Sequence, residues 1–298
     1  MFGSALQYAM HYPKRLAGAL ATDPVGLFEK LQDRIVQNWE YRVPVYRHEL
    51  SANWEGQVHE WLGCEWPCAE RDAFHALWPR VVDSVRSAGI DVGPASFAGF
   101  NDGDTALVRA IWCIVRHLKP KHVVETGVAH GFTSRFILDA LERNGTGHLS
   151  SIDRPPLDPA TRERVGIAVP SELRHRWGLV AGSSQRCLPG LLSRLGAIDL
   201  FVHDSLHTAR NVSFELGHAW AALRPGGILV VDDIDSNAGF GSFLRKTSGF
   251  LALVCEAEPV RPDERRFNGK GLFGLILKDP AQPILWPDGG LAPPRADA

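Results

Sequence analysis

Two spacings of apolar residues alternate along the chain from about residue 103. Residues 105–118 and 211–223 carry apolar side chains at helical spacing, which predicts one helix in each segment. Short apolar runs of the kind found in buried strands lie between and after such segments, at 123–126, 148–152, 179–181, 200–203 and 228–231. This alternation predicts an α/β domain built on a doubly wound, mainly parallel sheet.

Two further strands are predicted near the end of the chain, at residues 250–255 and 272–277. The polar stretch between them is too short for a typical crossover helix, so we expect the two strands to be antiparallel. The predicted sheet therefore has seven strands and an antiparallel last strand.

The first hundred residues differ in composition, because five of the nine tryptophans lie there. Asp23 and Pro24 resemble the cap and first position of a helix, and residues 71–87 show a second helical period. We expect a mainly helical region at 1–100 that serves as a cap, a lid or an oligomerisation arm, or whose aromatic residues simply pack onto the main domain. The main domain is placed at 101–279, and a proline-rich, irregular tail at 280–298.

Composition narrows the class of protein. The chain is 45% hydrophobic and 22% charged, with a formal net charge of -2, which gives no indication of a nucleic-acid partner. No apolar run approaches the length of a membrane span, and the first residues lack the apolar core of a signal peptide. The odd number of widely spread cysteines, five, favours reduced thiols, and we expect a cytoplasmic protein.

Cys64 and Cys68 lie near His59 and His75 in the sequence, which raises the alternative of a zinc site. Only two thiolates are available in this segment and their spacing is loose. Buried or surface thiols are therefore the favoured interpretation.

The strongest chemical signal is the segment at residues 123–134. A strand ends near Glu125, and Gly127 and Gly131 follow before a helical repeat, which predicts a strand, a tight turn and a helix start. Glycines let a ligand approach the backbone, and a helix N-terminus favours an anionic group. The dinucleotide pattern Gly-x-Gly-x-x-Gly is missing, and Glu125 would repel a diphosphate but pair with an ammonium group. The segment thus favours S-adenosylmethionine, which carries an amino group and a sulfonium.

Every predicted parallel strand ends in a polar group. Because ligands of such sheets bind beyond the carboxyl ends of the strands, we expect these groups to converge on one site. A single acid at a strand end is often only a helix cap, but polar groups at all five ends are harder to explain in that way. The five groups are Glu125, Asp153, the turn at 182–185, Asp204 with His207, and Asp232 with Asp233.

Asp204, Asp232 and Asp233 are expected to come together if their strands are neighbours. Three carboxylates in one cleft repel one another, and Mg²⁺ would relieve this repulsion because it prefers oxygen ligands. The alternative is that one acid binds the cofactor while the others cap helices. His207 lies in the loop where a substrate would sit and could accept a proton from a hydroxyl nucleophile. Its alternative role is a hydrogen bond to the backbone or the cofactor.

These motifs resemble class I S-adenosylmethionine-dependent methyltransferases, and among them the bivalent-metal-dependent O-methyltransferases of the catechol O-methyltransferase type and of antibiotic sugar pathways. The resemblance covers roughly residues 103–278 and implies a Rossmann-like fold. It implies that Asp153 binds the ribose and that the turn at 182–185 binds the adenine. The cofactor-binding residues would be Glu125, Thr126, Gly127, Ala129, Gly131, Phe132, Thr133, Asp153, Ser183, Ser184, Gln185 and Asp204.

The resemblance also places Asp204, Asp232 and Asp233 where these enzymes have metal ligands, and His207 where they have a catalytic lysine. Residues 204–207 are similar to an Asp-Gly-Asp-His segment of a broad bacterial methyltransferase family, but Leu206 replaces its second acid. His207 and Asp204 are therefore the predicted catalytic residues, with His207 or the metal alone acting on the proton.

The sequence predicts an S-adenosylmethionine-dependent methyltransferase that methylates oxygen on a small molecule or sugar with help from Mg²⁺. Two alternatives stay open. One is a nicotinamide-dependent oxidoreductase, which the missing glycine pattern disfavours. The other is a non-catalytic, cofactor-binding member of the same fold, which the substitution by Leu206 keeps in view. The N-terminal region is a candidate contact for a homo-oligomer.

Overall fold

The computed structural model describes residues 24–40, 46–90, 92–97, 100–156, 158–258 and 271–279. The predicted tail at 280–298 and the expected helix cap, Asp23, lie outside these ranges, whereas the expected first helical position, Pro24, begins a helix. The helices are α3 (Pro24–Glu40), α4 (Trp54–Trp61), α5 (Arg71–Ser87), α6 (Thr105–Leu118), α7 (Phe132–Asn144), α8 (Pro159–Arg162), the 3-10 helix η1 (Ser171–Arg176), α9 (Ser184–Leu195), α10 (Ala209–Ala222) and α11 (Gly239–Lys246). The strands are β1 (Gly93–Phe97), β2 (Phe100–Asp102), β3 (His122–Thr126), β4 (His148–Asp153), β5 (Trp177–Ala181), β6 (Ile198–His203), β7 (Leu223–Val231), β8 (Phe250–Glu256) and β9 (Leu272–Lys278).

A seven-stranded sheet with the order β5-β4-β3-β6-β7-β9-β8 forms the centre of the molecule. The five neighbouring strands β5, β4, β3, β6 and β7 pair in parallel, whereas β9 is antiparallel to both β7 and β8. The predicted doubly wound sheet with an antiparallel last strand is confirmed. The strand order reverses between β3 and β6, and a crevice for ligands opens at such a switch point.

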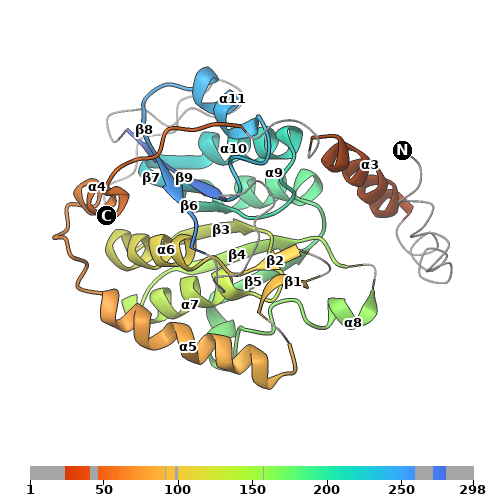
Figure 1. Ribbon diagram of the computed structural model, residues 1–298, viewed down its shortest axis with the longest axis horizontal. Helices are drawn as coiled ribbons and strands as arrows, with labels where there is room; N and C mark the ends of the chain where they lie inside the picture. Colours follow the sequence, from red (N-terminus) through yellow and green to blue (C-terminus); the bar gives the residue numbers. More distant parts are fainter. Residues whose placement is uncertain are drawn as a thin grey trace.

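Helices cover both faces of the sheet, with α5, α6 and α7 on one side and α9, α10 and α11 on the other (Figure 1). Alternate residues of one strand point into the two layers, because successive side chains of a strand face opposite ways. Val123 joins the core under α6 and α7, while Val124 joins the core under α9 and α10. The apolar runs that form the inner strands β3, β6 and β7 are therefore buried on both faces.

The N-terminal elements attach to this sheet domain in different ways. Helix α5 packs as an aromatic layer on α6 and α7, and the ring centroids of Phe74 and Phe136 are 5.3 Å apart. This confirms that aromatic residues of the region pack onto the main domain. The hairpin β1–β2 falls at the expected domain boundary and was not predicted, since Gly93 and Pro94 are typical of a loop.

Helix α3 crosses the loops that follow the parallel strands. Asp33 pairs with Arg154 after β4 at 2.6 Å, and Glu40 accepts a hydrogen bond from the amide of Ala209 at 3.0 Å. In Figure 1, α3 lies at the edge of the molecule beside α9. Its outer side is apolar, and Phe28 and Trp39 are 61% and 65% exposed. The oligomer contact expected in this region stays a prediction.

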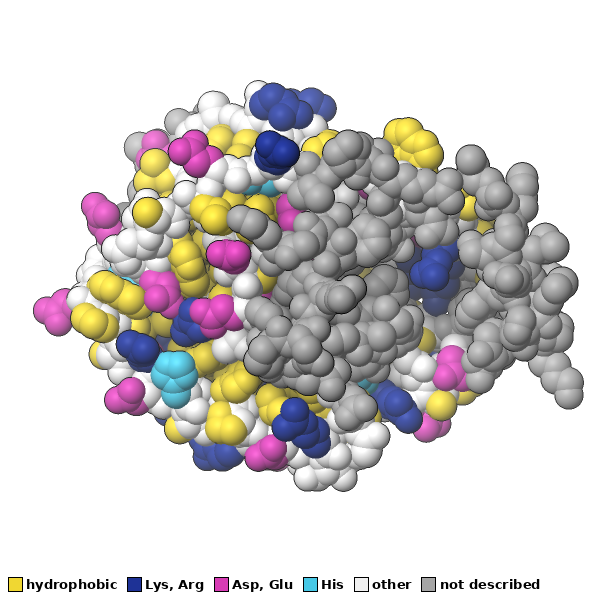
Figure 2. Space-filling view, in the orientation of Figure 1, with side chains coloured by type: hydrophobic (Ala, Val, Ile, Leu, Met, Phe, Trp, Pro, Cys, Tyr) yellow, Lys and Arg dark blue, Asp and Glu magenta, His cyan; other side chains and the backbone are white. Residues whose placement is uncertain are grey.

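The described surface is mixed in charge. On the face shown in Figure 2, acidic and basic side chains alternate with apolar ones, and neither sign forms a continuous patch over the described part. None of the described helices combines the length and the apolar character needed to span a membrane.

Candidate functional site

The carboxyl ends of β3, β4, β6 and β7 lie side by side. Thr126 pairs with Ile152 of β4 and with His203 of β6, and His203 pairs with Val231 of β7. Backbone hydrogen bonds carry this register one residue beyond the strands, from the Asp204 amide to the Thr126 carbonyl at 2.9 Å and from the Asp232 amide to the His203 carbonyl at 2.9 Å. The polar strand ends identified in the sequence are thus gathered at one edge of the sheet.

The loop after β3 is held in an unusual backbone conformation. Gly127 and Gly131 have φ angles of 86° and 85°, in the left-handed region that favours glycine. A Cβ atom on Gly127 would lie 1.9 Å from the backbone oxygen of Asp204. A glycine is therefore required at position 127 because the loop after β3 lies against the loop after β6. Gly131 is the N-cap of α7 and has no capping side chain, so the first-turn amides are available to an anionic ligand group.

Glu125 is a fully buried acid beside this loop. The hydroxyls of Ser134 and Ser151 both donate to its Oε2 atom, each at 2.6 Å, whereas Oε1 has no hydrogen-bond partner among the described residues. Burial raises the pKa of Glu125 to about 7, and the two serine hydroxyls counter part of this increase. An unpaired buried acceptor is costly, and a ligand ammonium group would satisfy it. The residues present therefore fit the amino group of S-adenosylmethionine.

Other predicted members of the cofactor loop are oriented differently. The Thr126 hydroxyl is donated to Glu215, and the Phe132 ring lies in the core with its centroid 6.3 Å from that of Trp78. These two side chains point away from the loop surface, and the Thr126 carbonyl is already bonded to the Asp204 amide. Thr133 is buried in the first turn of α7, and Ala129 lies in the loop with a φ of 49°.

Asp153 ends β4 and faces the same loop. Its Oδ1 atom accepts a hydrogen bond from the Val128 amide at 3.2 Å, and burial raises its pKa to about 6. The predicted adenine turn is shorter than expected, because Ser183 is the N-cap of α9 and Ser184 and Gln185 are already helical. The Ser184 hydroxyl lies 3.3 Å from Oδ1 of Asn211, which joins this turn to α10.

Asp204, His207 and Asp232 bring their ligand atoms within 4.8 Å of one another. The sequence predicted Asp233 as a third acidic metal ligand. In the structure it is not part of this group, and its Oδ2 atom lies 3.5 Å from Nδ1 of His207. Asp233 has a φ of 48°, so the chain turns directly after Asp232. Burial lowers the pKa of His207 to about 4 against the opposing effect of Asp233, and the imidazole is neutral at pH 7. Two carboxylates and a neutral imidazole are a suitable ligand set for a divalent cation.

Sequence reasoning missed Glu215, the acid at the centre of the site. It is fully buried on α10 and accepts hydrogen bonds from the Thr126 and Ser205 hydroxyls, the Asn211 amide and Nδ1 of His203. Burial alone would raise the pKa of Glu215, but His203 and the hydrogen bonds outweigh it and lower the pKa to about 2. This carboxylate ties β3, β6 and the acidic loop into one unit.

A signal for Glu215 is nevertheless present in the sequence. Asn211 and Glu215 are four residues apart, and the apolar Val212, Leu216 and Ala219 place that side of α10 against the sheet. A polar pair within an apolar helix face indicates a buried network, since such groups are buried only with partners.

Several solved structures are similar to part of this chain. One is the O-methyltransferase TomG from Streptomyces achromogenes in complex with SAM, with 17% identity, a TM-score of 0.49 and coverage of 67% of this chain and 88% of that one. Another is an O-methyltransferase from Bacillus cereus in complex with SAH, with 13% identity, a TM-score of 0.46 and coverage of 67% and 90%. No curated protein matches the chain in sequence. Residues 124–234, which run from β3 to just beyond the end of β7, match a family described as a methyltransferase domain.

Proposed function

We propose that the protein is an S-adenosylmethionine-dependent methyltransferase that methylates oxygen on a small molecule or sugar with help from Mg²⁺. The observation that supports this most is the position of Glu125, Asp153 and the Asp204–His207–Asp232 cluster. All lie at one edge of the sheet, within the residues that match the methyltransferase family.

The cofactor contacts divide along this edge. The first-turn amides of α7 would bind the carboxylate of the methionine part, and Glu125 would accept from its ammonium group. Asp153 would accept from the ribose hydroxyls, and residues 183–185 would contact the adenine.

Methyl transfer is an in-line displacement, so the protein must position the two reactants and remove a proton from the nucleophile. Asp204 and Asp232 would hold Mg²⁺, which supplies a lower pKa for a bound hydroxyl group. Nε2 of His207 is buried without a hydrogen-bond partner among the described residues and would accept the proton, and the Asp233 carboxylate, 3.5 Å from Nδ1, would stabilise the imidazolium that forms.

The first test is a thermal-shift titration with S-adenosylmethionine, S-adenosylhomocysteine and NAD, each with Mg²⁺ and with EDTA. A ligand that binds the folded state raises the melting temperature by mass action. We expect a shift with the two methionine-derived ligands and none with NAD. A shift with NAD alone would favour the oxidoreductase alternative, and no shift with any ligand would contradict the cofactor assignment.

Asp153→Ala is expected to weaken S-adenosylhomocysteine binding roughly 10- to 100-fold, because a hydrogen bond to a charged group contributes about 1.5–3 kcal/mol. Isothermal titration calorimetry measures this change. Asp83→Ala on the exposed side of α5 is the control and should leave the affinity unchanged. Equal affinities of the Asp153 variant and the parent protein would remove Asp153 from the cofactor site.

His207→Ala is expected to lower kcat by about 10²–10⁴-fold, the usual contribution of a general base, while the affinity for S-adenosylhomocysteine stays the same. The control is His218→Ala. His218 lies within α10, and its Nδ1 atom forms a hydrogen bond with the Phe214 carbonyl of the same helix. Turnover is followed by the release of S-adenosylhomocysteine from a panel of hydroxylated acceptors. An active His207 variant would show that this imidazole does not take the proton.

A further inference from the structure

A second group of metal-type ligands lies far from the carboxyl edge. His59 belongs to α4, Cys68 to the loop before α5, and Cys113 and His117 to successive turns of α6. The Cys68 sulfur is 3.3 Å from the Cys113 sulfur and 3.4 Å from Nε2 of His117. Because α6 leads into the start of β3, the group lies toward the amino edge of the sheet, away from the site described above.

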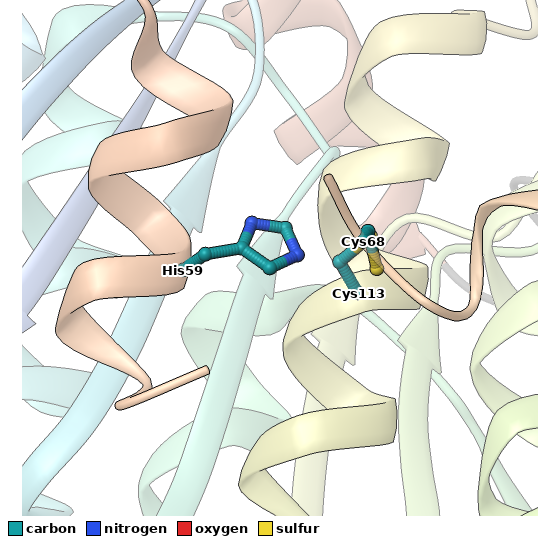
Figure 3. A group of neighbouring side chains, drawn as sticks. All are labelled: His59, Cys68 and Cys113. Carbon is teal, nitrogen blue, oxygen red and sulfur yellow. The ribbon is translucent and has the colours of Figure 1, made fainter. Parts of the chain in front are cut away.

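His59 is oriented as a metal ligand would be. It is 1% exposed, and its Nδ1 atom lies 2.7 Å from the Glu55 carbonyl, so the proton is on Nδ1 and the lone pair is on Nε2. Nε2 is buried, has no hydrogen-bond partner among the described residues, and faces the two cysteines (Figure 3). Metal-bound histidines usually donate their other ring N–H to a carbonyl in this way.

The spacing of the donor atoms also suits a small ion. The ligand atoms of His59, Cys68 and Cys113 all lie within 4.8 Å of one another. In a tetrahedral zinc site, bond lengths of about 2.0–2.3 Å place the ligands roughly 3.3–3.8 Å apart. The ring of His117 is 5.4 Å from that of His59 between centroids, so both imidazoles border the same space.

The electrostatics of the group favour a dication. Cys68 and Cys113 are each 6% exposed, so both sulfur atoms are shielded from water. Two thiolates and two neutral imidazoles would balance the charge of Zn²⁺. A neutral complex can be buried without the cost of an isolated charge.

We propose that His59, Cys68, Cys113 and His117 bind one Zn²⁺ in a closed, structural site that fastens α4 and the loop before α5 to α6. Binding forms two S–Zn and two N–Zn bonds and releases the two thiol protons to solvent. Two residues considered from the sequence have other contacts, since the Cys64 thiol donates to the Leu62 carbonyl and His75 accepts from Arg71. The missing ligands come from α6, about 45 residues later in the chain. This proposal does not depend on the proposed function.

The test measures metal in the full chain, purified under reducing conditions and dialysed against metal-free buffer. Zinc released on denaturation is quantified with a colorimetric chelator, and we expect one ion per chain. Cys68→Ser should lose the ion, whereas Cys64→Ser, a matched thiol four residues earlier, should retain it. Asp204→Asn should also retain it, which separates this site from the acidic cluster at the carboxyl edge.

Cobalt provides a readout on the unmodified chain, in case a serine variant fails to fold. Co²⁺ added to metal-free, reduced protein should give thiolate-to-metal charge transfer and the strong visible bands of a tetrahedral site. Reduced protein that takes up neither Zn²⁺ nor Co²⁺ would overturn the proposal. So would an intact mass lower by two hydrogens that maps to a Cys68–Cys113 disulfide, since a disulfide leaves no thiolate ligands.

Discussion

Replacing Glu215 by Gln is expected to lower the free energy of unfolding by about 1–3 kcal/mol, the usual cost of leaving a buried hydrogen-bonding group without its partner. Both Glu215 and His203 are 0% exposed, and their side chains are 2.6 Å apart. The amide keeps the shape of the carboxylate but loses one acceptor atom and the negative charge. At least one of the donors from Thr126, His203 and Ser205 is then left without an acceptor in the core.

Glu142→Gln is the matched control for this experiment. Glu142 also pairs at 2.6 Å, with Arg176, but its side chain is 46% exposed, so we expect a much smaller change. Urea unfolding followed by tryptophan fluorescence measures both variants. Equal losses in the two variants would show that burial of Glu215 has no special effect.

The pH dependence gives a second readout for Glu215. Its pKa in the folded protein is lowered to about 2, below the value of about 4.3 for an exposed glutamate. The charged carboxylate therefore stabilises the fold above about pH 4.3, and this stabilisation is lost as the pH falls toward 2. The difference in stability between the parent protein and Glu215→Gln should shrink over that interval.

Gly127→Ala is expected to destabilise the protein by about 2–5 kcal/mol and to abolish turnover. About 1–2 kcal/mol comes from an alanine in the left-handed region, and about 1–3 kcal/mol from overpacking. The added Cβ would meet the Asp204 oxygen at 1.9 Å and the Ser205 Cα at 2.9 Å. These contacts are backbone atoms that no side-chain rotation can relieve, so the loop that carries Asp204 must move.

Gly145→Ala separates the two causes. Gly145 has a φ of 67°, also left-handed, but a Cβ there meets nothing within 4 Å. The Gly145→Ala variant should lose only the stability that an alanine costs in the left-handed region, and it should keep its activity. If Gly127→Ala unfolded at the same denaturant concentration as Gly145→Ala, the close approach of the two loops would not be a constraint on this fold.

The inner strands β3, β6 and β7 were predictable because they are short apolar runs buried on both faces, and such runs differ clearly from the helices between them. The convergence of the acids was predictable too, since parallel strands bring their carboxyl ends to one edge. The direction of each side chain at that edge was not. Asp233 turns toward His207 because of one positive φ angle, and Thr126 turns inward because Glu215 offers an acceptor.

The group around His59 shows a different limit of sequence reasoning. Its first two ligands lie nine residues apart, and a local search joins Cys68 to the nearby Cys64 and His75. The structure instead brings Cys68 against α6, because the aromatic layer of α5 packs on that helix. Contacts set by packing between distant segments leave no spacing pattern in the sequence.

The position of β9 has a consequence for how the protein is made. It is the last described strand of the chain, yet it lies between β7 and β8, and β8 has no other partner in the described sheet. On the ribosome, β8 therefore emerges before its one strand partner in the described sheet, and this pairing must wait for residues 272–278. Any nascent chain that stops before this point presents an open edge of β7 and a free strand, which are sites for aggregation.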